Sequence, residues 1–219
     1  MESDPLAEKK SIEFHRAAFR VLDSGGGLVG RILEQVARLK IAQPERMEFW
    51  RLWEQVAAMP VQDAQAAVLA PTTRGRLLRM RSPLTAALSS EERDAVWKHV
   101  AWSLFLDHYF AAADDLDLGP EEQSDLTGLP VEEVAGWREE TPAPFAGTVL
   151  DRLRLVVSAH SALALLYPTS GQRARWFRGG NRVLGGAPLD LIRDGRGDAV
   201  RDHLTAAVRL ASEDDEESS

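Results

Sequence analysis

Apolar residues recur at intervals of three and four along most of the chain, and this spacing constrains the fold more than any other feature. The clearest stripes are Leu28, Ile32, Val36 and Leu39; Phe49, Leu52, Val56 and Met59; and Val96, Val100, Leu104, His108 and Ala111. Such spacing places side chains on one face of an α-helix. No segment alternates convincingly between apolar and polar residues, as a half-buried strand does. The sequence therefore predicts an all-α fold.

The same patterns, together with glycine and proline breaks, predict where the helices lie. Predicted helices cover residues 11–22, 28–41, 44–58, 62–69, 74–81, 91–113, 120–126, a segment starting at Pro130 or Val131, 147–166, 172–177 and 197–212. We expect residues 1–10 to be frayed. We expect the acidic tail, residues 213–219, to be disordered because it is a run of solvated charges.

The composition restricts the class of protein. The chain has 219 residues, a net charge of −8 and no cysteine. An acidic total disfavours a general nucleic-acid binder, because phosphate contacts usually require a basic face. The lack of cysteine excludes disulfides and cysteine zinc sites. No apolar run reaches the ~18 residues of a membrane span, and the first residues lack the apolar core of a signal peptide. We therefore expect a cytoplasmic protein that does not bind membranes.

The glycine-rich segment WFRGGNRVLGG, residues 176–186, raises the question of a phosphate-binding loop. A P-loop needs lysine followed by serine or threonine, and the corresponding residues here are Gly186 and Ala187. The five histidines include no pair at i and i+4, and the acidic residues near Asp114 do not follow the EF-hand pattern. No nucleophile, base and orienting group stand together. We expect no enzymatic activity, no cofactor and no metal site.

Residues 120–140, PEEQSDLTGLPVEEVAGWREE, have the spacing of a helix-turn-helix motif. Gly128 supplies the tight turn, and apolar residues on both sides of it hold the two helices together. The start of the second helix would face DNA, and it carries Glu132 and Glu133. The spacing favours a helix-turn-helix, whereas the charge opposes DNA binding.

The one basic cluster in the chain, RGRLLRMR at residues 74–81, has two interpretations. The favoured one is a short amphipathic helix that buries Leu77, Leu78 and Met80 and leaves its arginines in solvent. In the alternative, basic side chains contact DNA phosphates. The residues that would do so are Arg74, Arg76, Arg79 and Arg81, together with Arg138. We expect any DNA binding to be weak.

Residues 148–211 resemble the toxin-binding domain of the Xre/MbcA/ParS-type antitoxins. The resemblance lies in RARWFRGGNRVLGGAPLDLIRDGRGDAVRDHL, which follows a long amphipathic helix. The matching residues are Trp176, Asn181, Leu184, Gly185, Gly186, Pro188, Leu189, Asp190 and Leu191. The segment 120–140 resembles the Xre-like helix-turn-helix of the same family, so the resemblance covers roughly residues 95–211, with a weaker likeness at 72–90.

This resemblance implies a fold, an organisation and a function. It implies a helical N-terminal extension at 1–90, an Xre-like helix-turn-helix bundle at 91–145 and a small helical toxin-binding domain at 146–212. Members of the family neutralise RES-domain toxins, which degrade NAD, by obstructing the active-site cleft. Many of them dimerise, and some repress their own operon. We expect a RES-domain toxin as partner and a homodimer.

The residue types in the glycine-rich segment suit a surface that another protein contacts. Tryptophan and arginine are enriched at binding hot spots, and glycine allows a backbone to approach closely. The candidate partner-binding residues are Trp176, Phe177, Arg178, Asn181, Arg182, Gly185 and Gly186.

Alternative interpretations remain open for these residues and for the function. Trp176, Leu184, Pro188 and Leu191 could instead hold the segment to the domain core, and Asn181 could cap a turn. The chain could also be a transcription regulator that acts without a toxin, or an adaptor that reuses the toxin-binding fold. The extra ~90 N-terminal residues favour the adaptor.

Overall fold

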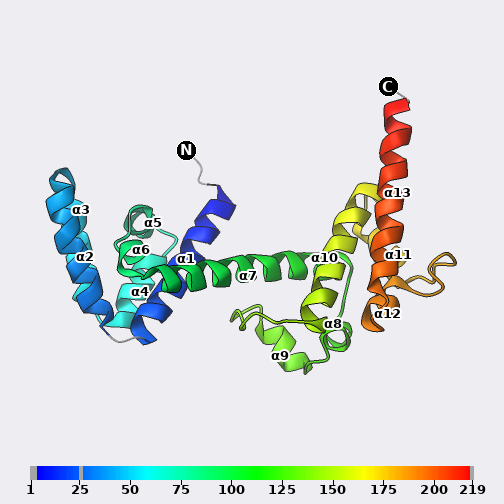
Figure 1. Ribbon diagram of the computed structural model, residues 1–219, viewed down its shortest axis with the longest axis horizontal. Helices are drawn as coiled ribbons and strands as arrows, with labels where there is room; N and C mark the ends of the chain where they lie inside the picture. The colour runs from blue at the N-terminus through cyan, green and yellow to red at the C-terminus, as the bar shows by residue number, and fades with distance from the viewer. Residues whose placement is uncertain (1–3, 25–26, 218–219) are drawn as a thin grey trace. The chain divides into compact units, whose positions relative to one another are not determined.

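The computed structural model describes residues 4–24 and 27–217, and within these ranges it contains helices and no strand, which confirms the predicted all-α fold (Figure 1). In chain order the elements are α1 (Pro5–Ser24), α2 (Leu28–Ala42), the 3₁₀ turn η1 (Pro44–Arg46), α3 (Met47–Ala57), α4 (Val61–Leu69), α5 (Thr73–Met80), α6 (Leu84–Ala87), α7 (Ser90–Asp115), α8 (Pro120–Thr127), α9 (Val131–Gly136), α10 (Thr148–Leu166), α11 (Ser170–Arg178), α12 (Pro188–Arg193) and α13 (Gly197–Glu217). Side chains are described as far as Glu213.

Four segments differ from the predicted helices, and one of them is α12, where the sequence predicted no helix. Helix α1 begins at Pro5, inside the segment expected to be frayed, and Glu8 near its start accepts a hydrogen bond from the buried Arg79. Helix α6 is too short to show an apolar period in the sequence. Helix α13 continues to Glu217, so residues 213–217 are helical rather than disordered as predicted. The rest of that prediction, residues 218 and 219, lies outside the described residues.

The chain forms two compact units, Met1–Ser103 and Leu104–Ser219, which we call unit 1 and unit 2. Their boundary falls inside α7, whereas the sequence placed a boundary at 90/91. The first half of α7 belongs to unit 1 because Arg31 of α2 donates hydrogen bonds to Glu92 of α7, one of them 2.8 Å long. The segments predicted as separate domains, 91–145 and 146–212, share unit 2 beyond Ser103, since α8 packs against α10.

Unit 1 has an aromatic core and a buried arginine. Trp50 and Trp53 of α3 are fully buried, as is Phe19 of α1. The guanidinium of Arg79 donates to the backbone carbonyls of residues 68 and 70, at 2.5 and 3.1 Å, and to the carboxylate of Glu8. Charge-assisted bonds of this kind compensate the desolvation of a buried cation. Arg79 therefore ties α1 to the α4–α5 turn.

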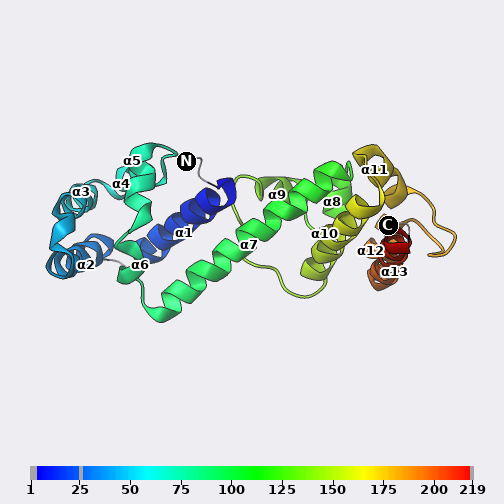
Figure 2. The same cartoon turned by 90° about the horizontal axis from the view of Figure 1, so that it is seen from above.

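Unit 2 is built around the contact of α10 with α13, which run side by side in Figures 1 and 2. Leu153 and Leu163 of α10 and Leu204 of α13 are buried. Phe177 of α11 and Ile192 of α12 are also fully buried. This core fixes the two ends of the glycine-rich segment, which lies between α11 and α12.

The segment predicted as a helix-turn-helix consists of two short helices, α8 and α9, joined by a glycine turn. Gly128 has a φ of +73°, a left-handed conformation that favours glycine. The hydroxyl of Ser124 donates to the carbonyl of Leu129 at 2.6 Å and stabilises the turn. Helix α9 has six residues and leaves Glu132 and Glu133 exposed. No described helix of the chain is long and apolar enough to cross a membrane.

Candidate protein-binding loop

Helix α11 supplies the fixed base of the glycine-rich segment. Its N-terminus carries a capping box: the Thr169 hydroxyl accepts from the Gln172 backbone N–H, and the Gln172 side chain accepts from the Thr169 N–H. The helix ends at Gly179, where a Cβ atom would lie 2.7 Å from the carbonyl oxygen of Arg175. Only glycine leaves room for this close approach, so the chain can turn sharply out of the helix.

The segment from Gly179 to Ala187, which we call the 179–187 loop, is closed by its own hydrogen bonds. The backbone N–H of Asn181 donates to the carbonyl of Gly186 at 3.0 Å, and the N–H of Gly185 donates to the carbonyl of Asn181 at 2.9 Å. The side-chain oxygen of Asn181 accepts from the N–H groups of Val183 and Leu184. Gly185 has a φ of +73°. The loop therefore has one defined shape without a partner.

The tip of the 179–187 loop presents exposed side chains. Val183 is 79% exposed, and Arg182 is exposed and makes no hydrogen bond or ion pair with any described residue. Leu184 and Pro188 are buried and hold the loop to unit 2. The ribbon shows the loop extending away from the neighbouring helices in two perpendicular views (Figures 1 and 2). The side chains of Arg182 and Val183 are therefore accessible to another molecule.

Two of the predicted partner-binding residues have structural roles instead. Phe177 is completely buried, because its position on α11 faces the core of unit 2. Arg178 donates to both carboxylate oxygens of Glu122, at 2.9 and 2.6 Å, and to the carbonyls of Leu116 and Asp117. These bonds hold the pKa of Glu122 below its usual range. Arg178 thus connects α11 to α8 and has few donors left for a partner.

Of the other predicted partner-binding residues, Asn181, Gly185 and Gly186 shape the loop, and Trp176 remains partly accessible. Asn181 is a turn-capping residue, as the alternative interpretation proposed, and Gly185 and Gly186 close the loop. A Cβ atom on Gly186 would lie 3.5 Å from the Leu191 side chain, which is ordinary contact. Trp176 is half-buried, and its ring stacks on that of His203 with centroids 6.2 Å apart and an angle of 12°.

Next to the loop lies a shallow hollow of about 350 Å³. Two aromatic residues and the glycine turn at the end of α11 contribute to its lining. The lining residues are Tyr167, Gln172, Arg175, Trp176, Gly179, Gly180 and Asn181. Sequence reasoning missed Tyr167 and Arg175 as possible contact residues. Their signal was weak, because neither lies in the glycine-rich segment itself.

A second ionic cluster behind the loop was also missed. Arg173 of α11 donates to both oxygens of Asp115, at 2.6 and 2.7 Å, and His160 of α10 lies 3.0 Å from the same carboxylate. The hydrogen bonds from Arg173 hold the pKa of Asp115 below its usual range. The sequence separations of 58 and 45 residues left no local pattern that could reveal this cluster.

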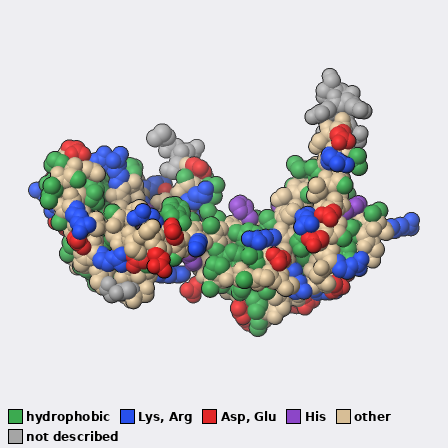
Figure 3. Space-filling model, in the orientation of Figure 1, with side chains coloured by type: hydrophobic (Ala, Val, Ile, Leu, Met, Phe, Trp, Pro, Cys, Tyr) green, Lys and Arg blue, Asp and Glu red, His purple; other side chains and the backbone are tan. Residues whose placement is uncertain are grey.

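The predicted DNA-binding arginines are not equivalent. Arg79 is buried and engaged as described above, so it does not present its charge to a phosphate. Arg138 bonds the carboxylate of Asp114 and lies over the Phe110 ring at 4.2 Å. The other three, Arg74, Arg76 and Arg81, are exposed on unit 1. On the visible face of each unit, basic and acidic side chains are interspersed (Figure 3).

The described residues include no group of three or more histidine, cysteine or acidic side chains placed to hold a metal ion. Comparison of the chain with family models, with curated proteins and with solved structures finds no match. The resemblance to the antitoxins therefore rests on the motif residues of the sequence alone.

Proposed function

We propose that this chain is an antitoxin-like protein that binds a RES-domain toxin and obstructs its NAD-degrading site. The observation that carries the proposal is the 179–187 loop, which is closed by its own hydrogen bonds and exposes Arg182 and Val183. The sequence motif that resembles the antitoxin family coincides with this loop.

The loop has the physical properties of a segment that inserts into a cleft. A loop already held in its bound shape loses little conformational entropy on binding, so more of the contact energy contributes to affinity. The bonds of Asn181 provide this preorganisation, and the buried Leu184 and Pro188 fix the base. The exposed Val183 provides apolar area that a partner can bury. The Arg182 guanidinium provides donors for a carboxylate.

Direct binding to DNA is a minor part of the proposed function. Helix α9 exposes Glu132 and Glu133 at the end that would approach phosphates, and repulsion there weakens association. Any repression of an operon would therefore be weak. A homodimer, which the family resemblance implies, is part of the proposal.

Co-expression with a RES-domain toxin from the same host tests this function. We expect the full chain to co-purify with the toxin and to restore growth, with a complex mass that reveals the number of copies. Val183→Asp should abolish both effects, since it places a charge where a desolvated apolar contact forms. The matched control is Ile41→Asp, at an 85% exposed position of α2 in unit 1. If the wild-type chain neither binds nor protects, the adaptor or regulator alternatives replace the antitoxin proposal.

A further inference from the structure

The arginines around the 179–187 loop fall into two classes. Arg173 and Arg178 point inward and bond acidic residues of α7 and α8. Arg175 and Arg182 are exposed, and neither makes a hydrogen bond or ion pair with a residue that the structure describes. The chain has no lack of carboxylates, since its net charge is −8. Two guanidinium groups on one short segment are nevertheless left without one.

Arg175 and Trp176 both line the hollow beside the loop. The ring of Trp176 is held by the stack on His203, and its indole N–H makes no hydrogen bond with the described residues. The hollow thus combines the ring of Trp176 with the guanidinium of Arg175.

We infer that this hollow receives an acidic side chain, Asp or Glu, from a segment of the partner protein in which apolar residues flank the acid. The carboxylate bonds the guanidinium of Arg175. An apolar neighbour of the acid packs on the exposed part of Trp176. This inference rests on the proposed function, and it specifies the chemistry of the partner surface that meets the loop.

Charge complementarity is the argument for this occupant. Arginine and carboxylate form paired, charge-assisted hydrogen bonds. Tryptophan and arginine together make up the residue types most enriched at binding hot spots. The glycine floor leaves room for a backbone, because a Cβ atom at Gly180 would meet nothing within 4 Å. A basic partner segment would instead meet the positive charge of Arg175.

The inference is tested without the toxin by a pair of short peptides that differ in one group. The probes are Ac-Leu-Glu-Leu-NH₂ and Ac-Leu-Gln-Leu-NH₂, titrated into the full-length protein while the Trp176 indole N–H signal is followed by NMR. The Trp176→Phe variant assigns that signal among the six tryptophans. We expect saturable shifts with the Glu peptide and at least about threefold weaker binding of the Gln peptide, since only the carboxylate makes charge-assisted bonds.

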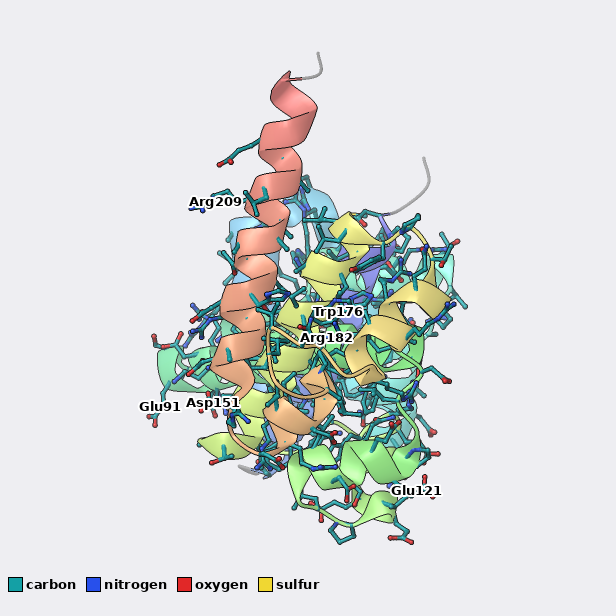
Figure 4. The ribbon with its side chains drawn as sticks, turned by 90° about the vertical axis from the view of Figure 1, so that its right-hand side faces the viewer. Glu91, Glu121, Asp151, Trp176, Arg182 and Arg209 are labelled. Atoms are coloured by element: carbon teal, nitrogen blue, oxygen red, sulfur yellow. The ribbon has the colours of Figure 1, made fainter. Side chains whose placement is uncertain are left out.

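Two variants complete the test. Arg175→Ala should weaken the binding of the Glu peptide by about threefold or more, to the affinity of the Gln peptide. The control Arg209→Ala removes an exposed arginine from α13, which Figure 4 labels well away from Trp176 and Arg182, and should bind as wild type does. Equal binding of the two peptides, or no effect of Arg175→Ala, overturns the inference.

The toxin itself supplies an independent second arm. The Arg175→Glu variant of the chain should bind the co-expressed RES-domain toxin about tenfold or more weakly than wild type does. Arg209→Glu is the control. Peptide discrimination without any toxin binding supports a hollow that receives an acidic side chain and contradicts the proposed function. Toxin binding that is insensitive to Arg175→Glu, with no peptide discrimination, supports the proposed function and contradicts the inference.

Discussion

Replacement of Arg178 by methionine should destabilise unit 2 rather than remove a direct contact with a partner. The change deletes the paired bonds to Glu122 and the bond to the Leu116 carbonyl. The Arg178 and Glu122 side chains are each 32% exposed, so the pair lies between the exposed and the buried case. Exposed ion pairs contribute up to about 1 kcal/mol, and loss of one partner from a buried pair costs about 3–5 kcal/mol. We therefore expect Arg178→Met to lower the free energy of unfolding by about 2 kcal/mol.

Urea unfolding measures this loss, and hydrogen exchange with mass spectrometry locates it in α8 and α11. The control is Arg193→Met, whose exposed pairing with Asp190 should contribute less than about 1 kcal/mol. The low pKa of Glu122 adds a pH test. Its contribution is complete above the ordinary glutamate pKa of 4.5 and is lost as the pH falls through the lowered value, so variant and wild type should converge in acid. An Arg178→Met protein that is as stable as wild type at neutral pH refutes this role.

Three further predictions concern unit 1. Burial lowers the pKa of His15 to about 4 from 6.5. The neutral imidazole therefore contributes its full share of the unfolding free energy above about pH 6.5, and at most about 3 kcal/mol of it is lost as the pH falls towards 4. Urea unfolding at several pH values should show this decrease, and the His15→Leu variant should not show it. Arg79→Met should cost about 3–5 kcal/mol, because it leaves two carbonyls and a carboxylate without their donor, whereas the exposed Arg76→Met should change thermal stability little. Gly30→Ala should stabilise α2 by roughly 0.5–1 kcal/mol, because a Cβ atom at this position meets nothing within 4 Å. Gly75→Ala should lower the melting temperature, since a Cβ atom on Gly75 would lie 2.1 Å from a backbone carbonyl oxygen. A melting temperature that is higher for Gly75→Ala than for Gly30→Ala would contradict both expectations.

Much of the fold could be predicted from the sequence because helical periodicity is a local property. The stripe of Leu28, Ile32 and Val36 predicted a helix at 28–41, and α2 occupies Leu28–Ala42 with the same three residues buried. The unit boundary within α7 could not be predicted, because it depends on contacts between distant segments, such as that of Arg31 with Glu92. Local signals carry no information about which half of a long helix packs against which neighbours.

The candidate site was predicted at the right segment, but the roles of several residues were not. Residue type alone suggested that Phe177 and Arg178 face a partner. The position of each on α11 decides otherwise, since one meets the core and the other meets Glu122, 56 residues away. Arg175, three residues earlier on the same helix, was passed over and is exposed. The face that a short helix buries depends on its tertiary neighbours, and single-sequence patterns do not contain them.

The most direct test of the central claim is inhibition of NAD cleavage by a purified RES-domain toxin from the same host. The full chain is titrated into the toxin while NAD consumption is followed, and the Val183→Asp and Ile41→Asp variants are compared with wild type. We predict that wild type and Ile41→Asp abolish NAD cleavage near one chain per toxin, and that Val183→Asp does not inhibit. Undiminished cleavage with excess wild-type chain, or equal inhibition by the Val183→Asp variant, would contradict the claim that the 179–187 loop neutralises a toxin.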